Sequence, residues 1–148
     1  MLDKQKHAIE VLNDIVNILE DGKKGYRTAA EHIEDQDLRT MFNLYAQQRA
    51  DFSAQIQNEI RELGGEPERN DDTKGKMHRV WLNLKAAVTG NDKDNVITEC
   101  ERGETSAIEE YEEALKEDIP EFLKSKLVKQ HDEIRNNLKM IRKIKDRD

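Results

Sequence analysis

Cysteine, proline and long apolar runs are scarce in this sequence, and each scarcity excludes something. Cys100 is the single cysteine, so the chain has no intrachain disulfide framework. No apolar run is long enough to span a membrane, and the N-terminal stretch MLDKQKHAIE lacks the apolar core of a signal peptide. Only two prolines and seven glycines fall within 148 residues, which favours long helices. We therefore expect a cytoplasmic helical protein that does not act at a membrane.

The chain is acidic overall, with 32 Asp and Glu against 25 Lys and Arg and a formal net charge of −7. General DNA and RNA binders gain most of their affinity by neutralising phosphates with Lys and Arg, so we expect no nucleic-acid partner. The C-terminal stretch MIRKIKDRD is basic, but cations at a helix C-terminus complement the helix dipole. Charged residues make up 39% of the chain, as is typical of helices with solvated outer faces.

Apolar residues recur at steps of three and four along five segments, which is the period of an amphipathic helix. The expected helices cover residues 2–33, 38–63, 76–88 and 93–115, and the last begins at the segment DIPE, residues 118–121. Asp35 or Asp37 is expected to cap the second helix, and Asp118 with Glu121 forms a capping-box pattern for the last. The pair GG ends the second helix, and residues 64–75 are the most loop-like segment. The chain thus has four long helices and one short helix.

The order and spacing of these helices predict the fold class. Only the turn EDQD separates the first two helices, so they should be antiparallel neighbours. The short helix lies in the long connection between two such hairpins, and Trp81 is expected to anchor it to the core. Two helical hairpins joined by one crossover are the ferritin-like arrangement. We expect an all-α, ferritin-like four-helix bundle that forms a single domain over residues 1–148.

Each long helix interrupts its apolar stripe once, near its middle. The interruptions hold Gly22 and Lys23, Gln48 and Arg49, Gly103 and Glu104, and Gln130 and His131. Helices of similar length packed side by side bring their midpoints to one level, so these residues are expected to form one buried polar layer. Tyr26 and Tyr45 lie about one turn from that layer, where their hydroxyls would complete it. A buried charge is costly unless it is paired or ligated, so the layer must be an ion-pair network, a hydrated pocket or a metal site.

Two hairpins and the short helix carry a resemblance to a known family. The segments DGKKGYRTAAE…LYAQQRADF, CERGETSAIEEYEEAL…KQHDEIRNNL and HRVWLNLKAAVTG are similar to a bacterial family of ferritin-like four-helix-bundle proteins, known as domain of unknown function 2383. The resemblance covers nearly the whole chain and implies the ferritin-like fold. It implies no particular activity.

Ferritin-like di-iron proteins place one Glu on each of two helices and Glu-x-x-His on the other two. In that pattern Glu104 fits the single glutamate and His131 fits a histidine, but Val128 stands where the partner glutamate of His131 is expected. Gln48 and Glu20 are weaker matches on the first two long helices. A di-iron centre needs about six ligands, mostly carboxylates, so a complete ferroxidase centre is not expected.

The residues leave three functions open. The first is a non-catalytic bundle without a cofactor, a stress-related or binding module in which Arg49 pairs with Glu104. The second is an oxidoreductase that binds iron or manganese at a degenerate or mononuclear site formed by Glu104 and His131, with Glu20, Gln48 or Asp51 assisting. The third is an assembly protein that acts by self-association as a homo-oligomer.

Gly103 is unusual inside a helix, because glycine costs about 1 kcal/mol relative to alanine there. We expect a packing reason, such as the close approach of a neighbouring helix or of a bulky side chain. Cys100 lies on the same apolar stripe, one turn earlier, and is expected to pack as a small apolar residue.

Overall fold

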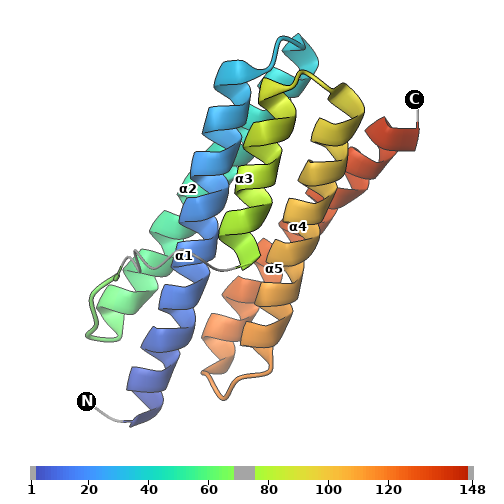
Figure 1. Ribbon diagram of the computed structural model, residues 1–148. Coiled ribbons are helices and arrows are strands. Elements are labelled where there is room, and N and C mark those ends of the chain that lie inside the picture. The colour runs from blue at the N-terminus through green and yellow to red at the C-terminus, as the bar shows by residue number, and fades with distance from the viewer. Residues whose placement is uncertain (1–2, 69–75, 147–148) are drawn as a thin grey trace.

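The computed structural model describes residues 3–68 and 76–146, and only the backbone of residues 76–78. The described residues form five α-helices and no strand. These are α1 (Asp3–His32), α2 (Gln36–Glu62), α3 (Lys76–Thr89), α4 (Lys93–Leu115) and α5 (Glu121–Asp146) (Figure 1). The expected all-α class is confirmed. Residues 69–75 of the expected loop lie outside the described residues.

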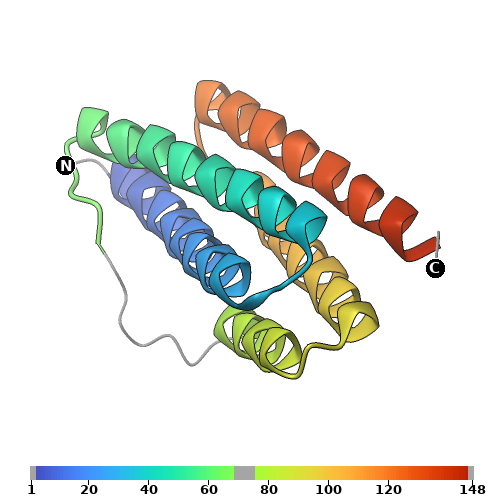
Figure 2. The same ribbon diagram turned by 90° about the horizontal axis from the view of Figure 1, so that it is seen from above.

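The bundle consists of two antiparallel hairpins, α1 with α2 and α4 with α5. The crossover helix α3 packs against α1 and α4. Seen along the bundle, α2 and α5 lie on one side of α1 and α4, and α3 lies on the other side (Figure 2). The α1–α2 turn, the α3–α4 turn and the C-terminal end of α5 all lie at the same end of the bundle (Figure 1).

The beginnings of α2 and α4 follow from side-chain caps. Asp35 precedes α2 in an extended conformation, and its carboxylate accepts a hydrogen bond from the Leu38 amide at 3.0 Å. Asp92 does the same for α4, accepting from the Asn95 amide at 3.3 Å. Each carboxylate satisfies an amide that has no partner within the helix, and its charge complements the helix dipole. Of the two caps expected for the second helix, Asp35 rather than Asp37 takes the position.

The beginning of α5 differs from the expectation. The helix starts at Glu121, and the carbonyl of Pro120 accepts its first hydrogen bonds, from the amides of Leu123 and Lys124. Asp118 is exposed and its carboxylate lies 3.6 Å from Lys4, so it does not cap the helix. Proline has a fixed φ that suits a helix entry, and it moves the start of α5 beyond the expected capping box.

Apolar side chains from all five helices fill the interior. The largest fully buried ones are Tyr26, Tyr111, Phe42, Leu12, Ile15, Leu19, Ile56, Ile60, Leu84, Leu123 and Leu127. They lie on the stripes that the helical period indicates, so burial of these stripes accounts for most of the stabilisation. Within the described ranges, no helix is both long and apolar enough to cross a bilayer.

Trp81 holds α3 against the bundle, as expected, by entering a notch lined with glycines. A Cβ atom at Gly25 of α1 would lie only 2.3 Å from the indole, and one at Gly22 would lie 3.4 Å from it. A Cβ atom at Gly103 of α4 would lie 3.4 Å from the same ring, an ordinary van der Waals separation. The Tyr26 ring meets the indole edge-on, with centroids 4.7 Å apart. Gly103 therefore faces a bulky side chain, but Gly25 makes the contact that excludes any larger residue.

Alanine substitutions at the two glycines should have opposite effects on stability. The change Gly25→Ala is expected to displace Trp81 and destabilise the fold by about 1–3 kcal/mol, as overpacking usually does. The change Gly103→Ala should be neutral or stabilising by up to about 1 kcal/mol, because its Cβ fits and alanine favours the helix. Urea unfolding followed by the fluorescence of the single tryptophan measures both. An equal loss of unfolding free energy in both variants would contradict the conclusion that Gly25 makes the tighter contact with Trp81.

Candidate functional site

A buried ion pair between α2 and α4 lies at the centre of the polar residues. The guanidinium of Arg49 donates from Nη2 to Oε1 of Glu104, and the two side chains are 1% and 0% exposed. Arg49 also donates from Nη1 to the side-chain oxygen of Gln48 at 2.9 Å. The Asn137 amide of α5 donates to the same Gln48 oxygen at 2.7 Å and to Oε2 of Glu104 at 3.1 Å. We call these four residues, from α2, α4 and α5, the Arg49–Glu104 network.

Arg49 keeps its positive charge inside the network. Burial lowers the pKa of Arg49, but the charge of Glu104, the neighbouring Tyr26 and Tyr111 and the hydrogen bond to Glu104 together raise it above the ordinary value. The ring of Tyr26 lies under the guanidinium, 5.7 Å from its carbon to the ring centroid, which is a cation–π contact. Arg49 is therefore a permanent positive charge inside the bundle.

Two tyrosines, Tyr26 and Tyr45, lie next to the network and pack ring against ring. The Tyr26 hydroxyl is buried and has no hydrogen-bond partner among the described residues. Burial and the charge of Glu104 raise its pKa well above the ordinary value. Tyr45 packs edge-on against Tyr26 at 5.5 Å, and burial followed by the charge of Glu104 raises the pKa of Tyr45 to about 12. The expectation that both hydroxyls complete the polar layer has to be corrected for Tyr26.

Gln130 belongs to a second polar cluster, closer to the beginning of α5. Its side-chain oxygen accepts from the Tyr111 hydroxyl at 2.7 Å. Its amide donates to the side chain of Gln55 at 3.1 Å and to the carbonyl of Phe52 at 3.4 Å. Burial raises the pKa of Tyr111 well above its ordinary value, so this hydroxyl stays a neutral donor.

His131 and Lys23 also lie apart from the network. The two ring nitrogens of His131 face Glu112 at 3.1 Å and Asp132 at 3.0 Å, at the edge of the α4–α5 hairpin. Lys23 is partly exposed and pairs with Glu20 at 2.8 Å along α1. The single layer expected from the sequence is thus divided into separate clusters.

The division has a geometric cause. Residues six positions apart on a helix are about 9 Å apart along its axis, so His131 and Asn137 of α5 cannot occupy one level. The midpoints of α2 and α4 do meet, at Arg49 and Glu104, but α5 reaches this level with Asn137, which lies beyond its own midpoint. Asn137 stands three residues after the buried Ile134 and four before the buried Ile141. That helical spacing predicts an inward-facing polar side chain, but Asn137 was not among the residues expected in the polar layer.

The residues present do not fit a di-iron centre. Arg49 and Asn137 already occupy both oxygens of Glu104, and the guanidinium puts a positive charge where a metal cation would bind. The other groups of the network are amides rather than carboxylates. In the part of the chain that the structure describes, no three His, Cys, Asp or Glu side chains are placed to hold a metal ion.

Comparison with known proteins places the chain in the ferritin-like class. A solved structure of a mutant of Mycobacterium smegmatis Dps1 is similar with a TM-score of 0.78, over 98% of this chain and 99% of that chain, at 10% sequence identity. The chain belongs to the family described as domain of unknown function DUF2383, whose model matches residues 7–117. The match ends before α5, so the family resemblance covers less of the chain than expected, whereas the structural likeness includes α5. None of the curated proteins matches the chain.

Removing the arginine should be more damaging than removing the pair. The change Arg49→Ala leaves Glu104 buried without its counter-charge and is expected to cost about 3–5 kcal/mol of unfolding free energy. The double change Arg49→Met with Glu104→Met removes both charges at similar volume, so it should be near neutral by comparison. Urea unfolding of both variants measures the difference. A loss below about 1 kcal/mol for Arg49→Ala would contradict a buried pair.

Cys100 offers a probe of the same interior. Its thiol is 1% exposed, and burial, with the charges of Glu104 and Glu99, raises its pKa well above the ordinary value. The reactive thiolate is therefore scarce at neutral pH, and modification by a maleimide should be far slower in the folded protein than in urea. Rapid modification of the folded protein, with the kinetics of an exposed thiol, would show that this part of the bundle opens readily.

Proposed function

We propose that this protein is a non-catalytic ferritin-like module that acts through its outer surfaces and not through a metal in its core. One observation carries the proposal: the Glu104 carboxylate is paired with Arg49 in the buried centre of the bundle. A cation that used Glu104 would have to displace the guanidinium or bind beside it. Either step works against a buried charge, at a cost of several kcal/mol.

A second candidate is the oxidoreductase with iron or manganese at Glu104 and His131. The proposal of a non-catalytic module is favoured because these two residues have different partners, Arg49 for the first and Glu112 for the second. Glu20, which the oxidoreductase hypothesis names as an assisting ligand, pairs with Lys23 on α1. A metal site would need all of these contacts to be exchanged together.

The cellular setting is part of the same proposal. The acidic net charge of −7 supports a protein partner or a second copy of the chain over a nucleic acid. A cytoplasmic location and a stress-related role agree with such a module and remain predictions from the sequence.

Metal analysis decides between the two candidates. Untagged protein purified without chelator, then incubated with ferrous iron or with Mn²⁺ and desalted, is expected to carry far less than one metal per chain. The measurement is elemental analysis of wild type, Glu104→Ala and the control Glu59→Ala, whose carboxylate is also buried but pairs with Lys126. The opposite result is about one metal per chain in the wild type and in Glu59→Ala, with the metal lost in Glu104→Ala. That result would favour the metal-binding oxidoreductase instead.

A further inference from the structure

The line along which α2 and α5 face each other, here called the seam, is polar over one part of its length and apolar over the other. Three polar bridges cross it, from Glu59 to Lys126 at 2.7 Å, from Gln55 to Gln130 at 3.1 Å and from Gln48 to Asn137 at 2.7 Å. All three lie between the middle of the seam and the end where α2 finishes and α5 begins. They hold the two helices at a distance that long polar side chains can span.

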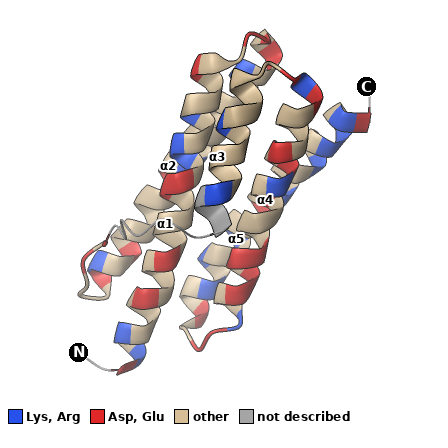
Figure 3. Cartoon of the chain, viewed as in Figure 1, with Lys and Arg blue, Asp and Glu red and all other residues tan. Residues whose placement is uncertain are grey.

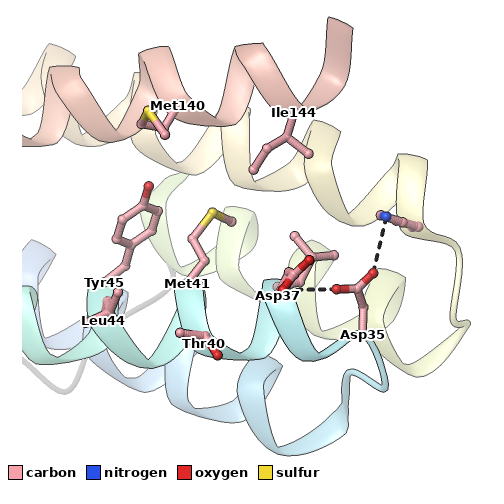
Figure 4. Close-up of a pocket in the computed structure, with 10 residues that line it drawn as sticks. Asp35, Asp37, Thr40, Met41, Leu44, Tyr45, Met140 and Ile144 are labelled. Atoms are coloured by element: carbon pink, nitrogen blue, oxygen red, sulfur yellow. Dashed lines mark hydrogen bonds and ion pairs between the residues drawn. The ribbon is translucent and has the colours of Figure 1, made fainter. Parts of the chain in front are cut away.

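Beyond the last bridge the seam opens into a groove of about 520 Å³. The first turns of α2 and the last turns of α5 form its walls (Figure 4). Met41 and Tyr45 on one wall point toward Met140 and Ile144 on the other (Figure 4). The Lys93–Asp35 ion pair, at 3.2 Å, lies at one end of the groove.

The rims of this groove carry exposed apolar side chains. Leu44 on α2 is 64% exposed and Met140 on α5 is 51% exposed, and both line the groove. Each exposes more than half of its surface although it adjoins an apolar cavity. Such a paired exposure marks an interaction surface rather than scattered surface residues.

The two rims have opposite charge. Asp37, Leu44 and Asp51 are exposed and seven residues apart, so they share one stripe of α2. Lys143 follows Met140 by three residues and Lys139 precedes it by one, and all three are exposed on α5. Figure 3 shows the basic residues gathered at this end of α5. The α2 rim therefore carries exposed acidic residues and the α5 rim exposed basic residues, while Lys93, which also lines the groove, is paired with Asp35.

We propose that a second copy of the chain covers this groove, related by a two-fold axis that runs parallel to the helices. That axis places α2 of one copy over α5 of the other, with the groove ends at the same level. Leu44 of each copy then enters the groove of its partner beside Met140, and the acidic rim of each meets the basic rim of the other. A two-fold contact uses the same patch twice, so the patch must be complementary to itself, as these rims are.

Sedimentation equilibrium of the wild type over a range of concentrations is the primary test, and a dimer is expected. Leu44→Glu and Met140→Glu each place a carboxylate on the apolar contact and should give monomers. Leu82→Glu is the matched control, because Leu82 is 52% exposed on α3, on the opposite side of the bundle, and should stay dimeric. Circular dichroism verifies that all variants are folded.

A charge exchange tests the orientation. Asp37→Lys should weaken the dimer by at least tenfold in dissociation constant, since it sets two cationic rims against each other. Adding Lys143→Asp to the same chain restores opposite charges across the contact and should recover most of the loss. Failure of the second change to rescue the first would overturn the proposed pairing of rims.

Several outcomes would overturn the second copy altogether. A wild type that stays monomeric at every concentration would leave the groove to a different ligand, such as a small apolar molecule. An assembly that Leu82→Glu breaks and Leu44→Glu does not would place the contact on the other side. This inference rests on the proposed function only in assigning the activity to an outer surface. The proposed function and the proposed dimer can fail independently. Metal analysis tests whether the core binds a metal, and sedimentation tests whether two chains associate through the groove.

Discussion

A single buried ion pair constrains the rest of this structure. Arg49 and Glu104 are both removed from water, and neither charge is tolerable there without the other and without further hydrogen bonds. The pair therefore requires α2 and α4 to meet at one level, and it requires amides from Gln48 and Asn137 to satisfy the remaining atoms. A Cβ at Gly22 would lie 3.1 Å from Nε of Arg49, so an alanine on this face of α1 would require the Arg49 side chain to shift by a few tenths of an ångström.

The same pair sets what the interior can do. Ferritin-like di-iron proteins keep carboxylates and histidines in the bundle core for metal. Here the buried Glu104 is paired with a guanidinium that stays charged. The fold is ferritin-like, and the chain belongs to the family described as domain of unknown function DUF2383. The conclusion about function therefore comes from the residues of the network and not from the fold.

The groove between α2 and α5 leaves apolar side chains exposed on the surface of the bundle. Across most of the α2–α5 seam, polar side chains join the two helices, and only the end near the α1–α2 turn is lined by apolar groups. Burying exposed leucine and methionine against a partner is favourable, and oppositely charged rims fix how that partner is oriented. The core thus holds Glu104 between Arg49 and Asn137, while the groove between α2 and α5 leaves apolar side chains exposed at the surface.

The sequence by itself determined the helices, the ferritin-like fold and the burial of Arg49 and Glu104, because the helical period acts over a few residues. It narrowed the cap of α2 to Asp35 or Asp37, and the structure shows Asp35. It also showed which residues break the apolar stripes. Only the tertiary structure decided which of them meet. Asn137, not His131, reaches Glu104, since the axial offset between helices depends on the packing of whole stripes and on the late start of α5 at Glu121. Likewise, the tight contact of Gly25 with Trp81 and the groove between α2 and α5 arise from segments distant in sequence, whose relative positions no local pattern specifies.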